Sequence, residues 1–220
     1  MSEAPRVALT FDAEHPDRPH HGDHADWVLD ELARLGVRAT FFLQGRWVEA
    51  EPRVARRVAD EGHLVGSHGF YHARMPLLTP DGFAEDVREA ERVIREVSGA
   101  DPRPWLRFPF GAGADDATIV GRAAELGYRH VGWDVELYEW EAGRSAHEIA
   151  ERAVGAARSH GDGAIVLAHT WPDPVAPALA EIVDRLRDSG ARFVGVDELD
   201  APPDLSPLAE PRPAPASATA

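Results

Sequence analysis

The chain has 220 residues, of which 44% are hydrophobic and 28% are charged, and its formal net charge is −15. This length and composition are typical of one globular domain with a substantial core, whereas the acidic balance argues against a nucleic-acid partner, whose phosphates would be repelled. No stretch approaches the roughly 20 apolar residues that cross a bilayer, so we expect neither a nucleic-acid nor a membrane partner.

Two further absences limit the kinds of metal site and the cellular location that we expect. The sequence has no cysteine, so disulfides and thiolate metal sites are excluded, and any metal must be held by nitrogen and oxygen. Residues 1–6 lack the basic region followed by an apolar run that is typical of a signal peptide. We therefore expect a cytoplasmic protein, or a secreted one if a leader was removed from the sequence.

The first half of the chain alternates β-prone runs with segments of helical period. Gly36 follows a segment with apolar residues at helical spacing, and glycine commonly ends a helix. The pair Thr79-Pro80 is typical of an N-cap followed by the first helical residue. In chain order we expect a strand at residues 6–11, a helix at 25–35, a strand at 37–43, a helix at 52–61, a strand at 64–65 and a helix at 79–97.

The second half continues the alternation. An acidic, aromatic stretch at residues 133–140 has no clear period and is interpreted as a loop. In chain order we expect a strand at residues 105–108, a helix at 116–126, a strand at 128–132, a helix at 146–159, a strand at 164–167, a helix at 178–188 and a strand at 191–196.

Strands that alternate with helices of 10 to 15 residues indicate βαβ units and a parallel sheet. About seven such units in one domain favour an α/β fold that closes into an irregular, distorted (β/α) barrel of about seven parallel strands. We expect this catalytic domain to span residues 1–200. Residues 201–220 contain six prolines and six alanines without a period, which predicts a disordered tail.

The unusual polar residues follow the ends of predicted strands. Asp12 and Glu14 end the first strand, His68 and His72 follow the third, and His169 ends the apolar run at residues 164–167. Because the carboxyl ends of parallel strands meet at one rim, we expect these side chains to form one active site.

His68 and His72 are four positions apart, and they lie on one face if their segment turns helically. That spacing lets a helical turn present two nitrogens to one metal ion. The alternative is a pair of ordinary surface histidines in a chain that has 11 of them.

Taken together, these motifs resemble the polysaccharide deacetylases, also called the NodB-homology domain or carbohydrate esterase family 4, over residues 6–199. All five motifs of that family have counterparts in the same order. They are Thr10-Phe11-Asp12-Ala13-Glu14, His68-x-x-x-His72, Arg107-Phe108-Pro109-Phe110-Gly111, the stretch from Trp133 to Trp140, and Leu167-Ala168-His169.

The resemblance implies one divalent metal ion, with His68 and His72 as two of its ligands. The family's third ligand falls on Ala13, which cannot bind a metal. Some branches carry Asp-x-Asp or Asp-x-Glu at this motif, so Glu14 is the expected replacement, with His15 or Asp17 as the alternatives. Two imidazoles and a carboxylate make zinc the expected ion, and cobalt or nickel fit the same ligands.

The resemblance also implies the catalytic groups. Asp12 matches the general base that takes a proton from the activated water, and Arg107 matches the guanidinium that holds this base, for which we expect a bidentate contact. His169 matches the general acid. Its carboxylate partner falls on Glu139, one methylene longer than the family's aspartate, with two alternatives, Asp134 and Glu136.

Three residues are expected to contact the substrate. Trp140 and Leu167 match the walls of a small pocket for the acetyl methyl group, although both could equally be core residues. Phe110 replaces a common tyrosine of the family, so a phenol contact is lost, while its backbone amide is expected to face the oxyanion.

We therefore expect metal-dependent hydrolysis of an N-acetyl group on an amino sugar or polysaccharide. The first alternative is the same machinery acting on an O-acetyl ester, a cyclic amide or a small acylated metabolite. The second is a non-catalytic barrel that binds glycans, which Ala13 favours and the retained Asp12, Arg107 and His169 oppose.

Overall fold

The computed structural model of the chain describes residues 4–17 and 24–199. The predicted tail at residues 201–220 lies outside the described residues, and so do two histidines of the first loop, His20 and His21. The predicted disorder of the tail therefore stays a prediction.

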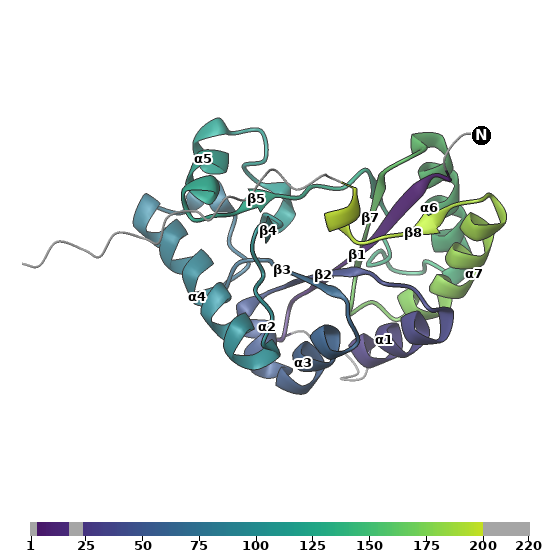
Figure 1. The fold of residues 1–220 in the computed structure, drawn as a ribbon, viewed down its shortest axis with the longest axis horizontal. Helices are drawn as coiled ribbons and strands as arrows, with labels where there is room; N and C mark the ends of the chain where they lie inside the picture. Colours follow the sequence, from purple (N-terminus) through teal and green to yellow (C-terminus); the bar gives the residue numbers. More distant parts are fainter. Residues whose placement is uncertain (1–3, 18–23, 200–220) are drawn as a thin grey trace, which may run out of the picture.

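In the described part of the chain, eight strands form one sheet in which every pair is parallel, with the order β5-β4-β3-β2-β1-β7-β6 and with β8 pairing β1. The sheet curls into an open half-barrel (Figure 1). This confirms the expected distorted barrel of about seven parallel strands. The strands are β1 (Arg6–Ala13), β2 (Thr40–Leu43), β3 (Leu64–Ser67), β4 (Trp105–Leu106), β5 (Arg129–His130), β6 (Val135–Glu136), β7 (Ala164–His169) and β8 (Arg192–Phe193).

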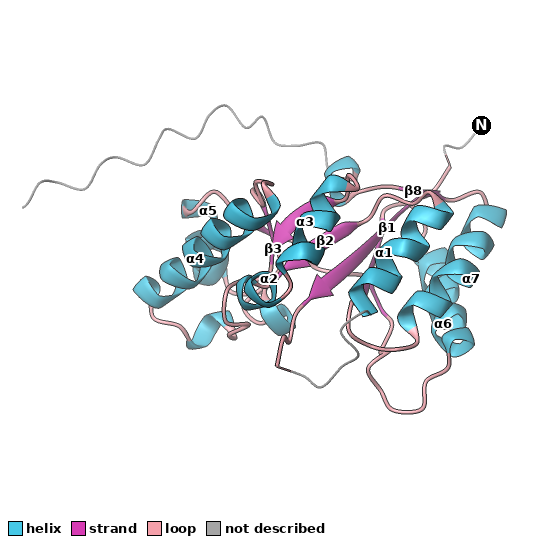
Figure 2. Cartoon of the chain, turned by 90° about the horizontal axis from the view of Figure 1, so that it is seen from below, coloured by secondary structure: helices cyan, strands magenta, loops and turns pink. Residues whose placement is uncertain are grey.

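Helices cover the outer face of this sheet (Figure 2). Helix α7 packs between α1 and α6, and α4 packs against α2 and α3. The helices are α1 (His24–Leu35), α2 (Gly45–Ala50), α3 (Pro52–Asp60), α4 (Pro80–Ser98), α5 (Ala117–Glu125), α6 (Ala146–His160) and α7 (Val175–Asp188), with short 3-10 turns at Met75–Leu77, Pro109–Gly111 and Val196–Glu198.

The ends of the helices follow the expected signals. The Thr79 side chain accepts a hydrogen bond from the Gly82 amide at the start of α4, as an N-cap does. Helix α4 ends at Ser98 and is followed by Gly99, which has a φ of +76° and takes the left-handed conformation that glycine adopts without steric cost. Helix α6 begins with a capping box between Ser145 and Glu148.

Strand β1 separates two environments because its side chains alternate between the faces of the sheet. Phe11 and Ala13 point into the apolar core beneath the helices, and Ala8 belongs to a smaller cluster that includes Phe42 and Trp105. Asp12 therefore faces the inside of the half-barrel, and Ala13 faces away from it.

Several elements differ from the sequence-based expectation. Some strands are shorter, since β2 begins at Thr40 rather than at residue 37 and β8 covers Arg192–Phe193 rather than residues 191–196. Helix α2 was not predicted, and the expected loop at residues 133–140 contains the short strand β6, which pairs β7. Helix α7 begins at Val175 rather than at Ala178. Pro177 is thus in the first turn of the helix, where proline is tolerated because the amide hydrogens there have no partner within the helix.

Gly66 is a sensitive position in β3. A Cβ atom added there would lie 2.7 Å from Cδ1 of Phe42 and 3.1 Å from Cβ of Trp105. We expect Gly66→Ala to lower the free energy of unfolding by about 1–3 kcal/mol because the core is overpacked. The matched control is Gly121→Ala in α5, where a Cβ would meet nothing within 4 Å, and a gain of about 0.5–1 kcal/mol is expected. Urea unfolding of both variants measures the change in the free energy of unfolding, which is expected to be a loss for Gly66→Ala and a gain for Gly121→Ala.

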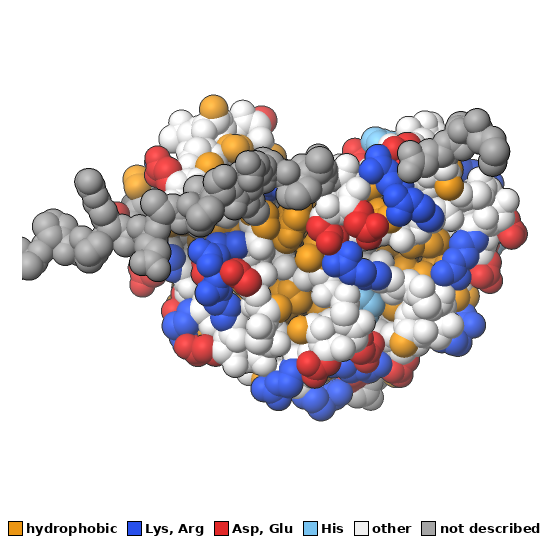
Figure 3. All heavy atoms as spheres, viewed as in Figure 1, with side chains coloured by type: hydrophobic (Ala, Val, Ile, Leu, Met, Phe, Trp, Pro, Cys, Tyr) orange, Lys and Arg blue, Asp and Glu red, His pale blue; other side chains and the backbone are white. Residues whose placement is uncertain are grey.

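Basic and acidic side chains are interspersed on the face shown in Figure 3, notably along the lower edge over α3 and α1. Arg57 of α3 contacts Asp26 of α1 at 2.8 Å and Asp30 at 2.6 Å. Across the described ranges, no helix combines the length and the apolar character needed to cross a membrane.

Candidate active site

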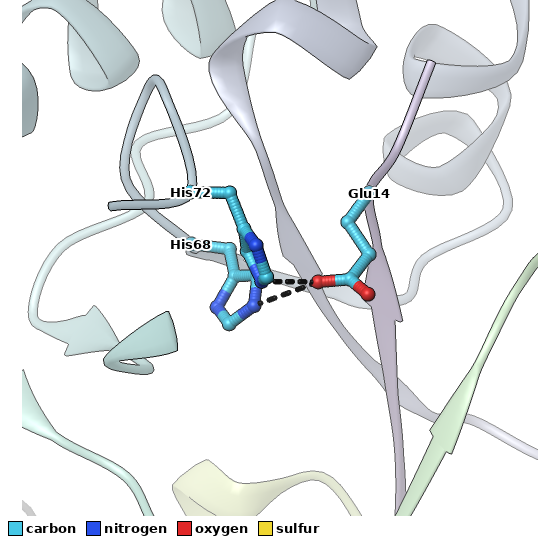
Figure 4. Close-up of side chains that lie close together, drawn as sticks. All are labelled: Glu14, His68 and His72. Carbon is cyan, nitrogen blue, oxygen red and sulfur yellow. Dashed lines mark ion pairs between the residues drawn. The ribbon is translucent and has the colours of Figure 1, made fainter. Parts of the chain in front are cut away.

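Glu14, His68 and His72 lie together at the carboxyl ends of β1 and β3 (Figure 4). Oε2 of Glu14 is 2.5 Å from Nε2 of His72 and 3.3 Å from Nε2 of His68. Glu14 is two residues beyond Asp12, so both carboxylates face the inside of the half-barrel, whereas Ala13 points into the core. The structure thus places Glu14, and not Ala13, beside the two imidazoles.

The segment from His68 to His72 is a loop, so the helical turn that would place both rings on one face is not present there. Gly69 has a φ of +71° and His72 a φ of +59°, so the backbone twice enters the left-handed region. The Asp86 carboxylate accepts hydrogen bonds from the amides of Phe70 and Tyr71, at 2.9 and 3.0 Å. This loop, rather than helical spacing, aims both rings at Glu14.

The three donor atoms can be tested as a cation site. They lie within 4.8 Å of one another, and two imidazole nitrogens with one carboxylate oxygen match the preference of zinc and its neighbours. Nδ1 of His68 lies 2.9 Å from the Arg107 carbonyl, which only accepts hydrogen bonds, so Nδ1 carries the hydrogen. The Nε2 lone pair then faces Glu14, and the donor set fits a divalent ion.

Neighbouring groups shift the pKa values of these residues in different directions. Burial lowers the pKa of His68, but the charges of Asp12 and Glu14 and the hydrogen bond with Glu14 outweigh it and raise that pKa. Burial raises the pKa of Glu14, but the hydrogen bonds with His15, His68 and His72 outweigh it and hold that pKa well below its usual value. Burial is the largest effect on His72 and lowers its pKa. Glu14 is therefore an ionised carboxylate beside imidazoles.

The two alternative ligands are placed differently. Nε2 of His15 lies 2.9 Å from Oε1 of Glu14, and its ring packs edge-on against that of His72, with 4.8 Å between the ring centres. Asp17 is exposed and pairs with Arg46 at 3.0 Å. Among the described residues, one other group has suitable ligand atoms, namely His147, Glu151 and Glu181. It is largely exposed, and Arg185 pairs with both of its carboxylates.

Asp12 is held by Arg107, which is fully buried. Nη1 of Arg107 donates to Oδ1 of Asp12 and to the Thr10 hydroxyl, each at 2.9 Å. Its other donors reach the carbonyls of Val131 and Gly132, and its guanidinium lies 4.1 Å from the centre of the Phe42 ring. The expected bidentate contact with Asp12 was wrong. The guanidinium divides its donors among four acceptors, and only one nitrogen reaches the carboxylate.

His169 ends β7 and is the register partner of Asp12 on β1. Its Nδ1 lies 2.8 Å from Oε1 of Glu139, and its backbone amide donates to the same oxygen at 2.6 Å. Of the three candidate partners, Glu139 contacts His169, whereas Asp134 accepts from the Ile165 amide. Nε2 of His169 points toward Glu14, with 3.8 Å to Oε1.

A cavity of about 320 Å³ joins these groups. It combines polar groups with aromatic walls, which is typical of a site for a small ligand or part of a larger one. Its lining is Asp12, Glu14, His15, His68, His72, Phe110, Trp133, Glu136, Trp140, Leu167, His169 and Trp171. All three residues expected to contact substrate, Phe110, Trp140 and Leu167, therefore face the same cavity.

A statistical profile of the polysaccharide deacetylases matches residues 2–131. The chain belongs to the polysaccharide deacetylase family. The resemblance inferred from the motifs is thereby confirmed. Among the relatives of this family member, a peptidoglycan-N-acetylglucosamine deacetylase of Bacillus cereus is 31% identical over 192 residues. That match covers 86% of the chain and 66% of the relative, so the chain spans about two thirds of that relative's length.

Solved structures agree with the fold of this family member. A structure described as T48 deacetylase with substrate has a TM-score of 0.77 and 32% identity, and the match covers 90% of this chain and 92% of that one. Wild-type BA3943 of Bacillus anthracis, a pseudoenzyme of carbohydrate esterase family 4, has a TM-score of 0.78 and 25% identity, with 90% and 66% covered.

Sequence reasoning missed Trp171. Its Nε1 lies 3.4 Å from Oε1 of Glu14, and its ring lines the cavity. The available signal was an aromatic residue two positions after His169, at the same end of the same strand.

Backbone strain is also concentrated at the site. The described part has four non-glycine residues with positive φ, namely His15, His72, Phe110 and Tyr138. Three of them line the cavity, and the fourth precedes Glu139. Such conformations persist where the surroundings impose them, and they cluster at functional sites.

Proposed function

We propose that this family member is a metal-dependent deacetylase that hydrolyses an N-acetyl group on an amino sugar or polysaccharide. The observation that carries the proposal is the convergence of Glu14, His68 and His72, whose donor atoms lie within 4.8 Å of one another. They lie at the rim that also bears Asp12 and His169. Base, acid and cation site thus share one cavity.

Glu14, His68 and His72 would hold the cation, with zinc as the expected ion and cobalt or nickel as alternatives. A divalent ion there supplies Lewis-acid polarisation of the acyl carbonyl and makes a nearby water more acidic. Its charge would complement the ionised Glu14 carboxylate.

Asp12 serves as the general base. Arg107 occupies Oδ1 of Asp12, which leaves Oδ2 on the side of His68, 3.5 Å from Nε2. Oδ2 takes the proton of the attacking water as the water oxygen bonds to the acyl carbon. Because Arg107 is fixed by two carbonyls as well, the carboxylate keeps one orientation during this transfer.

His169 serves as the general acid. Its Nδ1 hydrogen is held by Glu139, so Nε2 is directed into the cavity. When the carbon–nitrogen bond breaks, Nε2 gives its proton to the departing amine, and the products are acetate and the free amino group. Trp140 and Leu167 would enclose the methyl group, and the Phe110 amide would face the oxyanion.

Glu139 sets the protonation range of His169. Burial lowers the pKa of His169, but the hydrogen bond and charge of Glu139, with the charges of Asp12 and Glu14, outweigh it and raise that pKa. A raised pKa keeps the acid protonated at higher pH. We therefore expect Glu139→Gln to move the alkaline limb of the kcat/KM profile to lower pH. An unmoved limb would show that another group titrates there, and Glu181→Gln, at a partly exposed position of α7, is the control.

The non-catalytic alternative has a specific observation in its favour, because one structural neighbour is described as a pseudoenzyme. Ala13 likewise stands at the family's usual ligand position. The retained carboxylate at Glu14, together with Asp12, Arg107 and His169, supports the enzyme instead.

The deciding experiment measures bound metal and released acetate on the purified chain. We expect about one divalent ion per chain and acetate release from N-acetylglucosamine oligomers. Bound metal with release only from acetylated xylan or small N-acyl compounds would select the alternative substrates. Absence of both metal and turnover would favour the glycan-binding barrel. The cytoplasmic location remains a prediction.

A further inference from the structure

The two oxygens of the Glu14 carboxylate have different neighbours. Oε2 faces the ligand nitrogens, at 2.5 Å from His72 and 3.3 Å from His68. Oε1 lies 2.9 Å from Nε2 of His15 and 3.4 Å from Nε1 of Trp171, and Nε2 of His169 is further away, at 3.8 Å. A carboxylate only accepts hydrogen bonds, so the nitrogens of His15 and Trp171 donate to Oε1.

Glu14 needs such partners more than an aspartate in the strand would. It lies just beyond the last residue of β1, so no pairing of the sheet fixes its backbone. Its side chain also has one more rotatable bond than aspartate, and each ordered rotamer costs conformational entropy. Groups that hold one oxygen reduce this cost before a cation arrives.

The position of His15 is fixed by its backbone contacts. Its φ of +59° is unfavourable for a residue with a Cβ. Its backbone amide donates to Oε1 of Gln44 at 3.0 Å, and the Gln44 amide donates to the Ala13 carbonyl at 3.0 Å. Gln44 is buried and precedes α2. The junction between β2 and α2 therefore imposes the turn that brings the His15 ring back over Glu14.

Trp171 is also anchored, by its backbone carbonyl. Nδ1 of His24, the first residue of α1, donates to the Trp171 carbonyl at 2.6 Å. Nε2 of His24 pairs with Asp173 at 2.7 Å. Buried His24 and buried Gln44 have no place in the proposed chemistry, but each fixes one of the two groups that contact Oε1.

We propose that His15 and Trp171 are positioning residues that hold Oε1 of Glu14 and leave Oε2 to the metal ion. This inference rests on the proposed function. It explains how a carboxylate displaced by one residue, and longer by one methylene, presents a single oxygen to the two histidines. We call the pair the Oε1 clamp.

The test titrates metal-free protein with Zn²⁺ and Co²⁺ for the wild type, His15→Leu, His15→Gln and Trp171→Phe. Loss of an outer partner typically lowers metal affinity about 10- to 100-fold, and we expect this range for His15→Leu and a smaller loss for Trp171→Phe. His15→Gln retains a donor on a flexible chain and is expected to recover part of the loss. His147→Leu on the surface of α6 is the control.

The Co²⁺ absorption spectrum supplies a second readout. When Oε1 is released, Glu14 can bind through both oxygens, so the coordination number rises and the visible bands weaken. Wild-type binding with unchanged affinity and spectrum in His15→Leu and Trp171→Phe would overturn the clamp alone. A wild type that binds neither metal would overturn the proposed function, and the clamp with it.

Discussion

Glu14→Ala is expected to lower the affinity for the divalent ion by at least about 100-fold, since even outer partners of a ligand contribute 10- to 100-fold. Acetate release is expected to fall with it. The reason is geometric, because Oε2 is the carboxylate atom nearest to the Nε2 atoms of His68 and His72. Calorimetric titration of the metal-free protein and elemental analysis of the dialysed protein measure the loss.

Two matched variants make this result specific. Asp17→Ala removes the alternative carboxylate, which pairs with Arg46 at the surface. Glu181→Ala removes the other group of potential ligands, on α6 and α7. Both should bind one ion as the wild type does. Tight metal binding by Glu14→Ala, together with loss in Asp17→Ala, would move the ligand assignment to Asp17.

Arg107→Leu is expected to have the largest effect on stability, a loss of about 3–5 kcal/mol. The substitution leaves the buried Asp12 carboxylate without its cation and removes the donors to Val131 and Gly132. For a chain of this size the midpoint of thermal unfolding should fall by roughly 6–20 °C. Calorimetry and urea unfolding measure the two quantities.

The ion pair between Arg107 and Asp12 can also be tested by a double-mutant cycle. Asp12→Asn alone leaves Arg107 buried beside a neutral amide, so it also destabilises the fold. The combined Arg107→Leu and Asp12→Asn variant should lose less than the sum of the single losses, by about 0.5–3 kcal/mol, because the two groups are in direct contact. Simple additivity would contradict the view that the ion pair holds the base.

The fold could be predicted because its signals are local and repeated. Alternating strands and helices with caps such as Thr79 specify a parallel sheet, and a parallel sheet brings Asp12 and His169 to one rim. The alternation of β1 could also have indicated that Asp12 and Glu14 share a face. Metal binding and the catalytic roles stay predictions, as does the location of the protein.

The elements that were missed depend on tertiary contacts. Helix α2 has six residues and begins where the amides of Gly45 and Arg46 donate to the carbonyls of Gly69 and Phe70. A segment this short has no hydrophobic period that would predict a helix. Strand β6 has two residues and exists by pairing β7. A left-handed histidine such as His72 likewise has no sequence signal, so the spacing of the two histidines could not indicate that a loop directs their rings.

The left-handed backbone at His15, His72, Phe110 and Tyr138 has an evolutionary consequence. Glycine or asparagine would adopt these conformations at a lower cost, so selection for heat resistance alone should favour them at these positions. Each such replacement would also remove a ring from the cavity or from the turn before Glu139. If the bulky residues persist in heat-selected descendants, selection for turnover is maintaining them. If they are lost, selection for turnover no longer acts on these positions.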